Sequence, residues 1–163
     1  MFYGLSRLRL LSVLLPLVLV APPLGGRLSH RPAASSQSSG TTNTLDLRGV
    51  ACPRPSICVA VGEGGTIVRS TDGGRTWRRQ PSGTPDDFLY GVACPSPSTC
   101  VAVGGGGTIL RSTDGGRTWR SQTSGTTNFL FGVTCASPST CFAVGPRGTI
   151  LRSADGGRTW RRV

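Results

Sequence analysis

Side chains suited to acid–base chemistry are scarce in this sequence. It has one histidine, His30, one glutamate, Glu63, and no lysine, so all 18 of its basic residues are arginine. General acid–base catalysis uses mainly His, Glu, Asp, Lys, Tyr and Cys side chains. Three of the aspartates recur in one motif at turns, where aspartate commonly has a structural role. We therefore predict no catalytic residue and no cofactor, and we expect a protein that acts by binding.

The six cysteines raise a second question, whether they form disulfides or bind a metal ion. They form three pairs with the same C-x5-C spacing, Cys52–Cys58, Cys94–Cys100 and Cys135–Cys141. Six cysteines allow fifteen pairings, and the repeated spacing favours the local one. The spacing does not match a zinc-binding pattern and no histidine lies nearby, so we predict no metal site. We predict three disulfides, each closing a short proline-containing loop and each contributing roughly 2 kcal/mol.

The cysteine pairs belong to a unit that occurs three times. Its copies start at Gly49, Gly91 and Gly132, so successive starts are 42 and 41 residues apart. A fixed period of this length indicates a repeat architecture. Four strands per unit, repeated, are typical of β-propeller blades. In the second copy the four segments with strand character are residues 88–93, 100–103, 108–112 and 118–122.

We predict an all-β fold, a partial or oligomer-completed β-propeller with three four-stranded antiparallel blades. The blades are expected at residues 44–84, 85–126 and 127–163. In the second copy, the first and second strands carry small or apolar residues on both faces, which predicts burial on both sides. The fourth strand alternates Trp119 with Arg120, which predicts an exposed sheet edge. Asp-Gly-Gly and Gly-x-x-Gly segments supply the hairpin turns.

Each copy contains the motif Ser-x-Asp-x-Gly-x-Thr-Trp between its third and fourth strands. The motif residues are Ser70, Asp72, Gly74, Thr76, Trp77, Ser112, Asp114, Gly116, Thr118, Trp119, Ser153, Asp155, Gly157, Thr159 and Trp160. The motif resembles the aspartate box, or bacterial neuraminidase repeat. With the phrase Gly-Thr-Ile-Leu-Arg-Ser, it is similar to the photosystem II stability and assembly factor family and its exported relatives. The resemblance implies a propeller in which the Asp accepts backbone N–H bonds and the Trp packs beneath the turn, as a short acidic side chain beside glycines can do.

The resemblance also implies a function, a non-catalytic binding or assembly scaffold. The second hypothesis is a carbohydrate-active protein, either a glycan-binding lectin or a sialidase-like glycosidase remnant, because sialidases share the aspartate box. A sialidase needs an arginine cluster, an acid Asp, and a nucleophilic Tyr paired with a Glu. Here Tyr90 and Glu63 lie in different repeats, so we do not expect a glycoside hydrolase.

The N-terminal segment resembles a secretory signal. Arg7 and Arg9 precede an apolar run over residues 10–20, which is shorter than the about 20 residues that a transmembrane helix needs. We expect a signal peptide at residues 1–21, with cleavage as late as about residue 34, and an extracytoplasmic location, secreted or in the cell envelope. If the signal stays uncleaved, it would tether the protein to a membrane. Residues 22–43 are expected to be a flexible Pro/Ser-rich spacer.

Three blades are fewer than the four to eight that familiar propellers use to close a ring. Residues 36–43 resemble residues 121–128, which end the fourth strand of a blade, so the spacer could supply a closing strand. Two explanations remain open. Two chains form a homodimer with one six-bladed ring, or the sequence is a truncated piece of a longer propeller.

Residues that differ between copies are candidates for binding a partner. They lie in the turns and linkers at the end of the blades opposite the aspartate boxes: Glu63, Asp86, Asp87 and Arg147. Free variation of surface loops is the alternative explanation. Recurring arginines would form basic arcs, so the expected partner is a protein or an anionic envelope polymer or glycan. We expect no nucleic-acid partner, because the sequence shows no recognition helix or base-stacking pattern.

Overall fold

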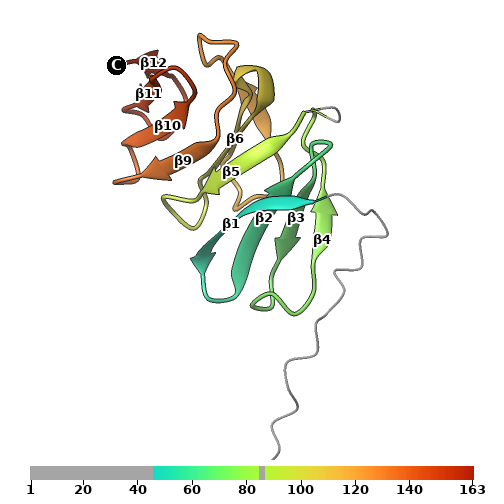
Figure 1. The fold of residues 1–163 in the computed structure, drawn as a ribbon. Helices are drawn as coiled ribbons and strands as arrows, with labels where there is room; N and C mark the ends of the chain where they lie inside the picture. The colour runs from blue at the N-terminus through green and yellow to red at the C-terminus, as the bar shows by residue number, and fades with distance from the viewer. Residues whose placement is uncertain (1–45, 85–86) are drawn as a thin grey trace, which may run out of the picture. The chain divides into compact units, whose positions relative to one another are not determined.

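The computed structural model describes residues 46–84 and 87–163, which form three four-stranded antiparallel sheets (Figure 1). The predicted signal peptide, the spacer with its closing strand, and Asp86 lie outside the described residues. Within the described part of the chain, no helix is long and apolar enough to cross a membrane. The predicted all-β class with three blades is confirmed.

Each blade runs through its four strands in sequence order. Blade 1 consists of β1 (Leu47–Arg54), β2 (Ile57–Gly62), β3 (Ile67–Ser70) and β4 (Arg78–Gln80). Blade 2 consists of β5 (Leu89–Ala93), β6 (Cys100–Gly104), β7 (Ile109–Ser112) and β8 (Arg120–Gln122), with a short 3-10 helix at Gly105–Gly107. Blade 3 consists of β9 (Gly132–Cys135), β10 (Cys141–Gly145), β11 (Thr149–Ser153) and β12 (Arg161–Arg162).

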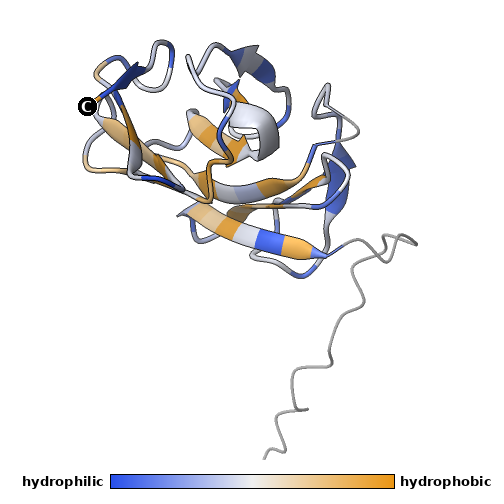
Figure 2. Ribbon diagram, turned by 45° about the horizontal axis from the view of Figure 1, so that its top comes forward, coloured by the Kyte–Doolittle hydropathy of each residue, from blue (hydrophilic) through white to orange (hydrophobic). Residues whose placement is uncertain are grey.

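Burial follows the order of the strands within a blade. Residues of β6 are all buried, and β2 is buried apart from its first residue, as the apolar pattern predicts. The outer strands β4, β8 and β12 carry exposed arginines, and Figure 2 colours them largely hydrophilic. Charge on an edge strand discourages pairing with another chain. The predicted exposed edge is therefore present in every blade.

The prediction that the first strand of blade 2 is buried on both faces is wrong in part, because Leu89 and Val92 are buried but the residues between them are half-buried and Phe88 is exposed. Most residues of β1 alternate between exposed and half-buried, and Val50 is 63% exposed. In blade 2, Phe88 just before β5 is 45% exposed. The reason is positional, because the first strands of successive blades lie beside one another at the inner side of the array (Figure 1). Contacts with β1, β2 and β9 bury Leu89 and Val92 of β5, whereas Phe88 precedes the strand and stays exposed.

Neighbouring blades pack through one repeated junction. At the first junction, Val61 and Ile67 of blade 1 share a core cluster with Leu89 and Val92 of blade 2. The equivalent cluster between blades 2 and 3 contains Val101, Val103, Ile109, Leu130, Ala143 and Leu151. Since burial of apolar surface contributes about 25 cal/mol per Å², these junctions are a main source of stability.

An arginine crosses each junction, and it is buried at the first junction and half-buried at the second. The Arg69 Nε donates to the carbonyl of Gly115, and the Arg111 Nε donates to the carbonyl of Gly156, each at 2.7 Å. Burial lowers the pKa of both arginines, and a nearby arginine of the next blade adds to this effect. Two of the recurring arginines therefore connect blades and do not contribute to the predicted basic arcs.

The three predicted disulfides are present. Cys52 bonds to Cys58, Cys94 to Cys100 and Cys135 to Cys141, with Cα atoms 4.1, 4.0 and 4.0 Å apart. Cys135 and Cys141 stand directly opposite each other on β9 and β10. Each disulfide thus closes the hairpin loop between the first two strands of its blade, and no described cysteine is free.

Candidate binding surface

The aspartate-box end of the blades repeats one hydrogen-bond network. Asp114 accepts bonds from the Thr118 backbone N–H at 2.9 Å and from the Thr118 hydroxyl at 2.6 Å. The Ser112 hydroxyl donates to Asp114 at 2.8 Å, and Trp119 Nε1 donates to the carbonyl of Gly116 at 3.2 Å. The same bonds occur around Asp72 and Asp155.

These bonds hold the box aspartates in their ionised form. Hydrogen bonds from Thr76, then from Ser70, lower the pKa of Asp72. Burial opposes ionisation of Asp114 and Asp155, but hydrogen bonds from the box threonine and serine outweigh it and lower each pKa to about 2. A carboxylate that is fully engaged by its own turn is poorly suited to acid–base catalysis, which agrees with the structural role that the resemblance implies.

The opposite end of the blades, which we call the linker end, contains the turns after the second strands and the segments that join the blades. Glu63 accepts a hydrogen bond from Arg48 at 2.5 Å, which raises the pKa of Arg48. Asp87 accepts a bond from the Thr108 hydroxyl at 2.8 Å and so attaches the linker to blade 2. Both acidic groups are engaged inside the chain, and a binding role for them, as for Asp86, stays a prediction.

Arg147 is the most unusual of the predicted binding residues. It has a φ of 55°, in the left-handed region, where the other two copies have Gly64 at 56° and Gly106 at 59°. Such a conformation costs a residue with a Cβ roughly 1 kcal/mol. Pro146 before it has no N–H, so blade 3 also lacks the backbone bond that Gly105 makes to Phe88 at 2.8 Å. The turn of blade 3 has diverged at the cost of local strain.

The linker end also carries an aromatic cluster that the sequence patterns did not predict. It consists of Phe88, Tyr90, Phe129 and Phe131, from β5, from the residue before it and from the segment before β9. Ring centroids lie 5.4 Å apart for Tyr90–Phe131, 6.2 Å for Phe129–Phe131 and 6.4 Å for Phe88–Tyr90. Phe88, Phe129 and Phe131 are 45%, 51% and 51% exposed. Exposed aromatic groups in contact with one another are typical of recognition surfaces.

Blade 1 replaces these aromatic residues with charged ones. The Glu63 N–H bonds to the carbonyl of Asp46 as the Gly105 N–H bonds to that of Phe88, so Asp46 occupies the position of Phe88. Arg48 likewise takes the position of Tyr90, and the two lie close enough for Tyr90 to add to the raised pKa of Arg48. Comparing the residues just before the first strands of the three copies could have revealed this difference.

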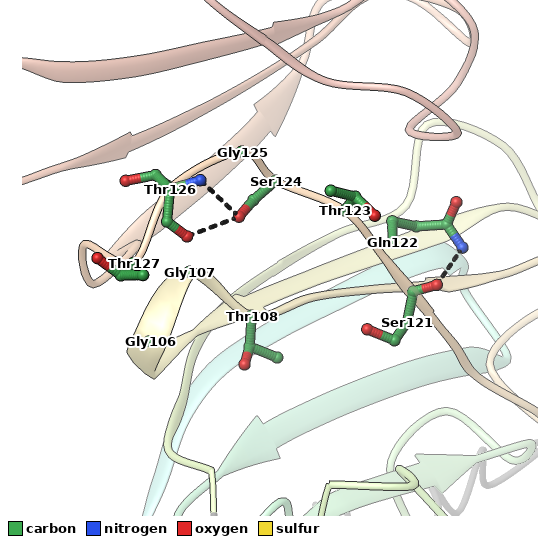
Figure 3. A pocket seen from close by; sticks show the side chains of 10 residues that line it. All are labelled: Gly106, Gly107, Thr108, Ser121, Gln122, Thr123, Ser124, Gly125, Thr126 and Thr127. Atoms are coloured by element: carbon green, nitrogen blue, oxygen red, sulfur yellow. Dashed lines mark hydrogen bonds between the residues drawn. The ribbon is translucent and has the colours of Figure 1, made fainter.

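A shallow open groove of about 730 Å³ lies beside blade 2 at the linker end (Figure 3). It is lined by Gly106, Gly107, Thr108 and residues 121–127. The Ser124 hydroxyl donates to the Thr126 carbonyl and accepts from its N–H, so part of the polar lining is engaged internally. No charged side chain lines the groove, so its polar contacts with a ligand would be hydrogen bonds from hydroxyl, amide and backbone groups.

Within residues 46–84 and 87–163, no group of three His, Cys, Asp or Glu side chains is placed to hold a metal ion. Arg48 lies against both Glu63 and Asp46, with 3.6 Å to the second carboxylate. The linker end therefore presents an exposed aromatic surface beside the Arg48–Glu63 ion pair.

Repeated boxes on four-stranded blades define the chain as an aspartate-box propeller-type protein. Residues 68–79 match the family model of the BNR/Asp-box repeat, and residues 87–154 match that of the Photosynthesis system II assembly factor YCF48. The resemblance inferred from the sequence is confirmed. The search of curated proteins found no match to this sequence.

Solved structures share the fold. YCF48 bound to D1 peptide is 20% identical with a TM-score of 0.66, over 74% of this chain and 41% of that one. YCF48 from Cyanidioschyzon merolae is 23% identical with a TM-score of 0.62, over 72% and 39%. A GH74 enzyme from Niastella koreensis is 21% identical with a TM-score of 0.58, over 71% and 21%. The chain thus spans about two fifths of the length of the YCF48 structures.

Proposed function

We propose that the chain is an extracytoplasmic, non-catalytic scaffold that binds a protein partner through the aromatic cluster. The observation that carries this proposal is the exposure of Phe88, Phe129 and Phe131 together at the end of the blades where the copies differ. Aromatic side chains bury a large area with little loss of conformational freedom, so they dominate many protein interfaces. An extended apolar segment of the partner would cover them.

Two comparisons support a polypeptide as the partner. The family match over residues 87–154 includes all four aromatic positions. One structural relative was solved as a complex with a D1 peptide, so a propeller of this kind can bind a peptide. The Arg48–Glu63 pair beside the cluster would add polar contacts at its edge.

The extracytoplasmic location rests on the signal-like residues 1–21 and on the disulfides. Disulfides persist in oxidising compartments and are rare in the cytosol. Expression of the full chain with separate recovery of the culture medium, periplasm and cytoplasm tests the location. We expect the processed protein outside the cytoplasm, and recovery of only unprocessed cytoplasmic protein would contradict export.

A peptide-binding experiment tests the partner class. A phage-displayed library of unstructured peptides is selected on the disulfide-intact protein, and the affinity of an enriched synthetic peptide is measured by fluorescence polarisation. We expect enrichment of apolar sequences. Replacing both Tyr90 and Phe131 with alanine should weaken binding at least tenfold, whereas Val163→Ala, which removes an apolar side chain that is 67% exposed outside the cluster, should not. Equal binding by both variants would exclude the cluster.

A glycan is the second candidate ligand. Aromatic faces can also stack on sugar rings, the groove beside blade 2 is polar, and the fold is shared with GH74 enzymes. Incubation with xyloglucan oligosaccharides and an assay for new reducing ends separates the hypotheses. The scaffold proposal predicts no cleavage. Cleavage that disappears in Glu63→Gln would replace it with a glycosidase, and binding without cleavage would replace it with a lectin.

A further inference from the structure

Each junction between blades has two different halves. The half from the earlier blade carries Val61 on β2 and its pairing partner Ile67 on β3. Arg69 lies on the same face of β3, two residues after Ile67. The half from the later blade carries Leu89 and Val92 on β5. Val61, Ile67 and Leu89 are fully buried, and Val92 is 9% exposed. The same two halves meet again between blades 2 and 3.

Blade 3 presents the first half of this junction, and none of the three described blades lies on it. Val144 and Ile150 pair across β10 and β11 as Val61 and Ile67 pair across β2 and β3. They are nevertheless 46% and 43% exposed. Arg152 occupies the position of the junction arginine, yet no described residue accepts a hydrogen bond from it, whereas Arg111 and Arg69 each reach a carbonyl.

Blade 1 presents the second half. Leu47 and Val50 occupy the positions of Leu89 and Val92, as their pairing with the second strand shows, and they are 48% and 63% exposed. Gly73 corresponds to the glycine that accepts the junction arginine, and no described arginine donates to its carbonyl. Ala60 and Val68, in the middle of this half, are buried. Its exposed parts are therefore Leu47 and Val50 on β1 and the aspartate-box turn around Gly73.

The aspartate-box glycine shows the same asymmetry. A Cβ on Gly116 would lie 2.6 Å from Val59 of the preceding blade, and one on Gly157 would lie 2.7 Å from Val101. A Cβ on Gly74 would meet only Trp77 of its own box, at 3.7 Å. Gly74 therefore has the close-contact surface of a junction but no described residue seated on it.

We propose that a second copy of this chain completes both open halves, so that two chains associate head to tail into one closed six-bladed ring. Each chain would place Val144 and Ile150 against Leu47 and Val50 of its partner copy. Arg152 would donate to the Gly73 carbonyl across the new junction. Head-to-tail interfaces close into rings when the rotation allows it. Two copies of the three described blades would give six, which lies within the four to eight blades that propellers use.

This inference is independent of the proposed peptide binding. The occupant is argued from continuity with a junction that the described chain contains twice. Blade 3 repeats the first half with Val144, Ile150 and Arg152, and has Phe142 where blades 1 and 2 have Val59 and Val101. Apolar surface left open on a soluble protein favours such association. A cover supplied by the chain itself would leave it a monomer, head-to-tail contacts that do not close would give an open polymer, and a face-to-face contact between two identical halves would give a dimer that the mixing experiment below distinguishes.

The first experiment is the mass of the disulfide-intact protein by size-exclusion chromatography with light scattering. We expect twice the chain mass, independent of loading above the dissociation constant. A monomer at every concentration, or a broad distribution of larger species, would overturn the proposal.

A mixing experiment tests the head-to-tail arrangement. Ile150→Glu alters only the half on blade 3, and Leu47→Arg alters only the half on blade 1. Each variant alone should be monomeric, because every junction then contains one altered half. The equimolar mixture should recover a dimer, because one junction is unaltered and the other pairs opposite charges. A variant that dimerises alone through its unaltered half, or a mixture that stays monomeric, would contradict the arrangement.

Two further variants separate association from folding. Arg152→Ala should raise the dissociation constant tenfold or more, since a hydrogen bond from a charged donor is lost. Ser121→Glu, on the exposed outer strand of blade 2, is the control and should leave the dimer unchanged. An unchanged dissociation constant for Arg152→Ala would remove the polar part of the proposed junction.

Discussion

The two ends of the blades have diverged to different extents. At the aspartate-box end, the bond from the box threonine hydroxyl to the box carboxylate is 2.6 Å in all three copies. At the linker end, equivalent positions hold Asp46 and Arg48 in blade 1 but Phe88 and Tyr90 in blade 2. The aspartate-box end therefore repeats one hydrogen-bond network in all three blades, whereas the linker end carries different side chains on a backbone that the blades share.

The comparison separates stability from recognition. Each box satisfies backbone N–H groups within its own turn, and its glycines let the neighbouring blade approach closely. A substitution there should destabilise the fold. The aromatic cluster is half exposed, so a substitution there should change binding and leave stability nearly intact.

The largest expected effect is at Gly116. Gly116→Ala places a Cβ 2.6 Å from Val59 in a backbone with a φ of 84°, so strain and overpacking add. We expect a loss of about 3 kcal/mol in the free energy of unfolding, measured by urea denaturation. Gly125→Ala at the linker end is the control, because its φ is 73° but no atom lies within 4 Å of the added Cβ. It should cost about 1 kcal/mol. Equal losses would show that the close approach of the blades adds nothing.

Removal of a box carboxylate comes next. Asp114→Ala takes away the acceptor for Thr118, Arg117 and Ser112. We expect a loss of about 2–3 kcal/mol, since hydrogen bonds to a charged group contribute more than neutral ones. Asp87→Ala, which loses a single bond to Thr108, should cost less than half as much by the same denaturation assay. A larger loss for Asp87→Ala would reverse the proposed division.

Acid should weaken the aspartate-box end in particular. The pKa values of Asp114 and Asp155 are about 2 in the folded protein, below the about 3.9 of an unfolded chain. Their contribution is therefore complete above pH 4 and is lost as the pH falls toward 2, because the unfolded state then binds more protons. We expect the melting temperature to be flat from pH 5 to 7 and to fall below pH 4. In Asp114→Ala the acid-induced fall should be smaller.

The junction arginine should matter only where a blade follows. Arg111→Ala loses the 2.7 Å bond to Gly156 and should destabilise the chain by about 1.5–3 kcal/mol. Arg152→Ala should change the stability of the chain by less than 0.5 kcal/mol when tested in the Ile150→Glu background, which blocks association. Comparable losses for both would mean that Arg152 already has an essential contact within its own chain.

The smallest expected effect is a gain at the linker end. Arg147→Gly relieves the left-handed conformation of that residue, whose φ is 55°, and restores the glycine found in the other copies. We expect stabilisation of about 0.5–1 kcal/mol by urea denaturation, since relief of strain exceeds the extra entropy of the unfolded chain. Destabilisation would show that the Arg147 side chain makes a stabilising contact that outweighs its strain.

Much of the fold was predictable because its determinants are local. The three C-x5-C pairs place each disulfide across a hairpin, and the Asp-Gly-Gly turns require the positive φ values that Gly73, Gly115 and Gly156 adopt. The aspartate box was likewise predictable, because its hydrogen-bond donors and the carboxylate that accepts from them lie within eight successive residues. Because the unit occurs three times, the strands and turns assigned to one copy apply to all three blades.

The candidate site was less predictable, because its residues are brought together by packing of separate blades. Apolar residues such as Phe88 and Tyr90 have the same pattern whether a neighbour covers them or not, so burial was the natural expectation, and it was wrong for Phe88. Glu63 and Tyr90 lie in different repeats, yet both are close to Arg48. Contacts between repeats depend on how the blades stack.

The sequence by itself determined the strands, turns, disulfides and aspartate boxes of this protein, because each depends on residues close together along the chain. Only the tertiary structure decided which apolar residues are covered. Val61 and Val144 have equivalent places in their blades, but Val61 is buried and Val144 is 46% exposed. The difference is the presence of a following blade, since burial depends on neighbouring surface and not on residue type.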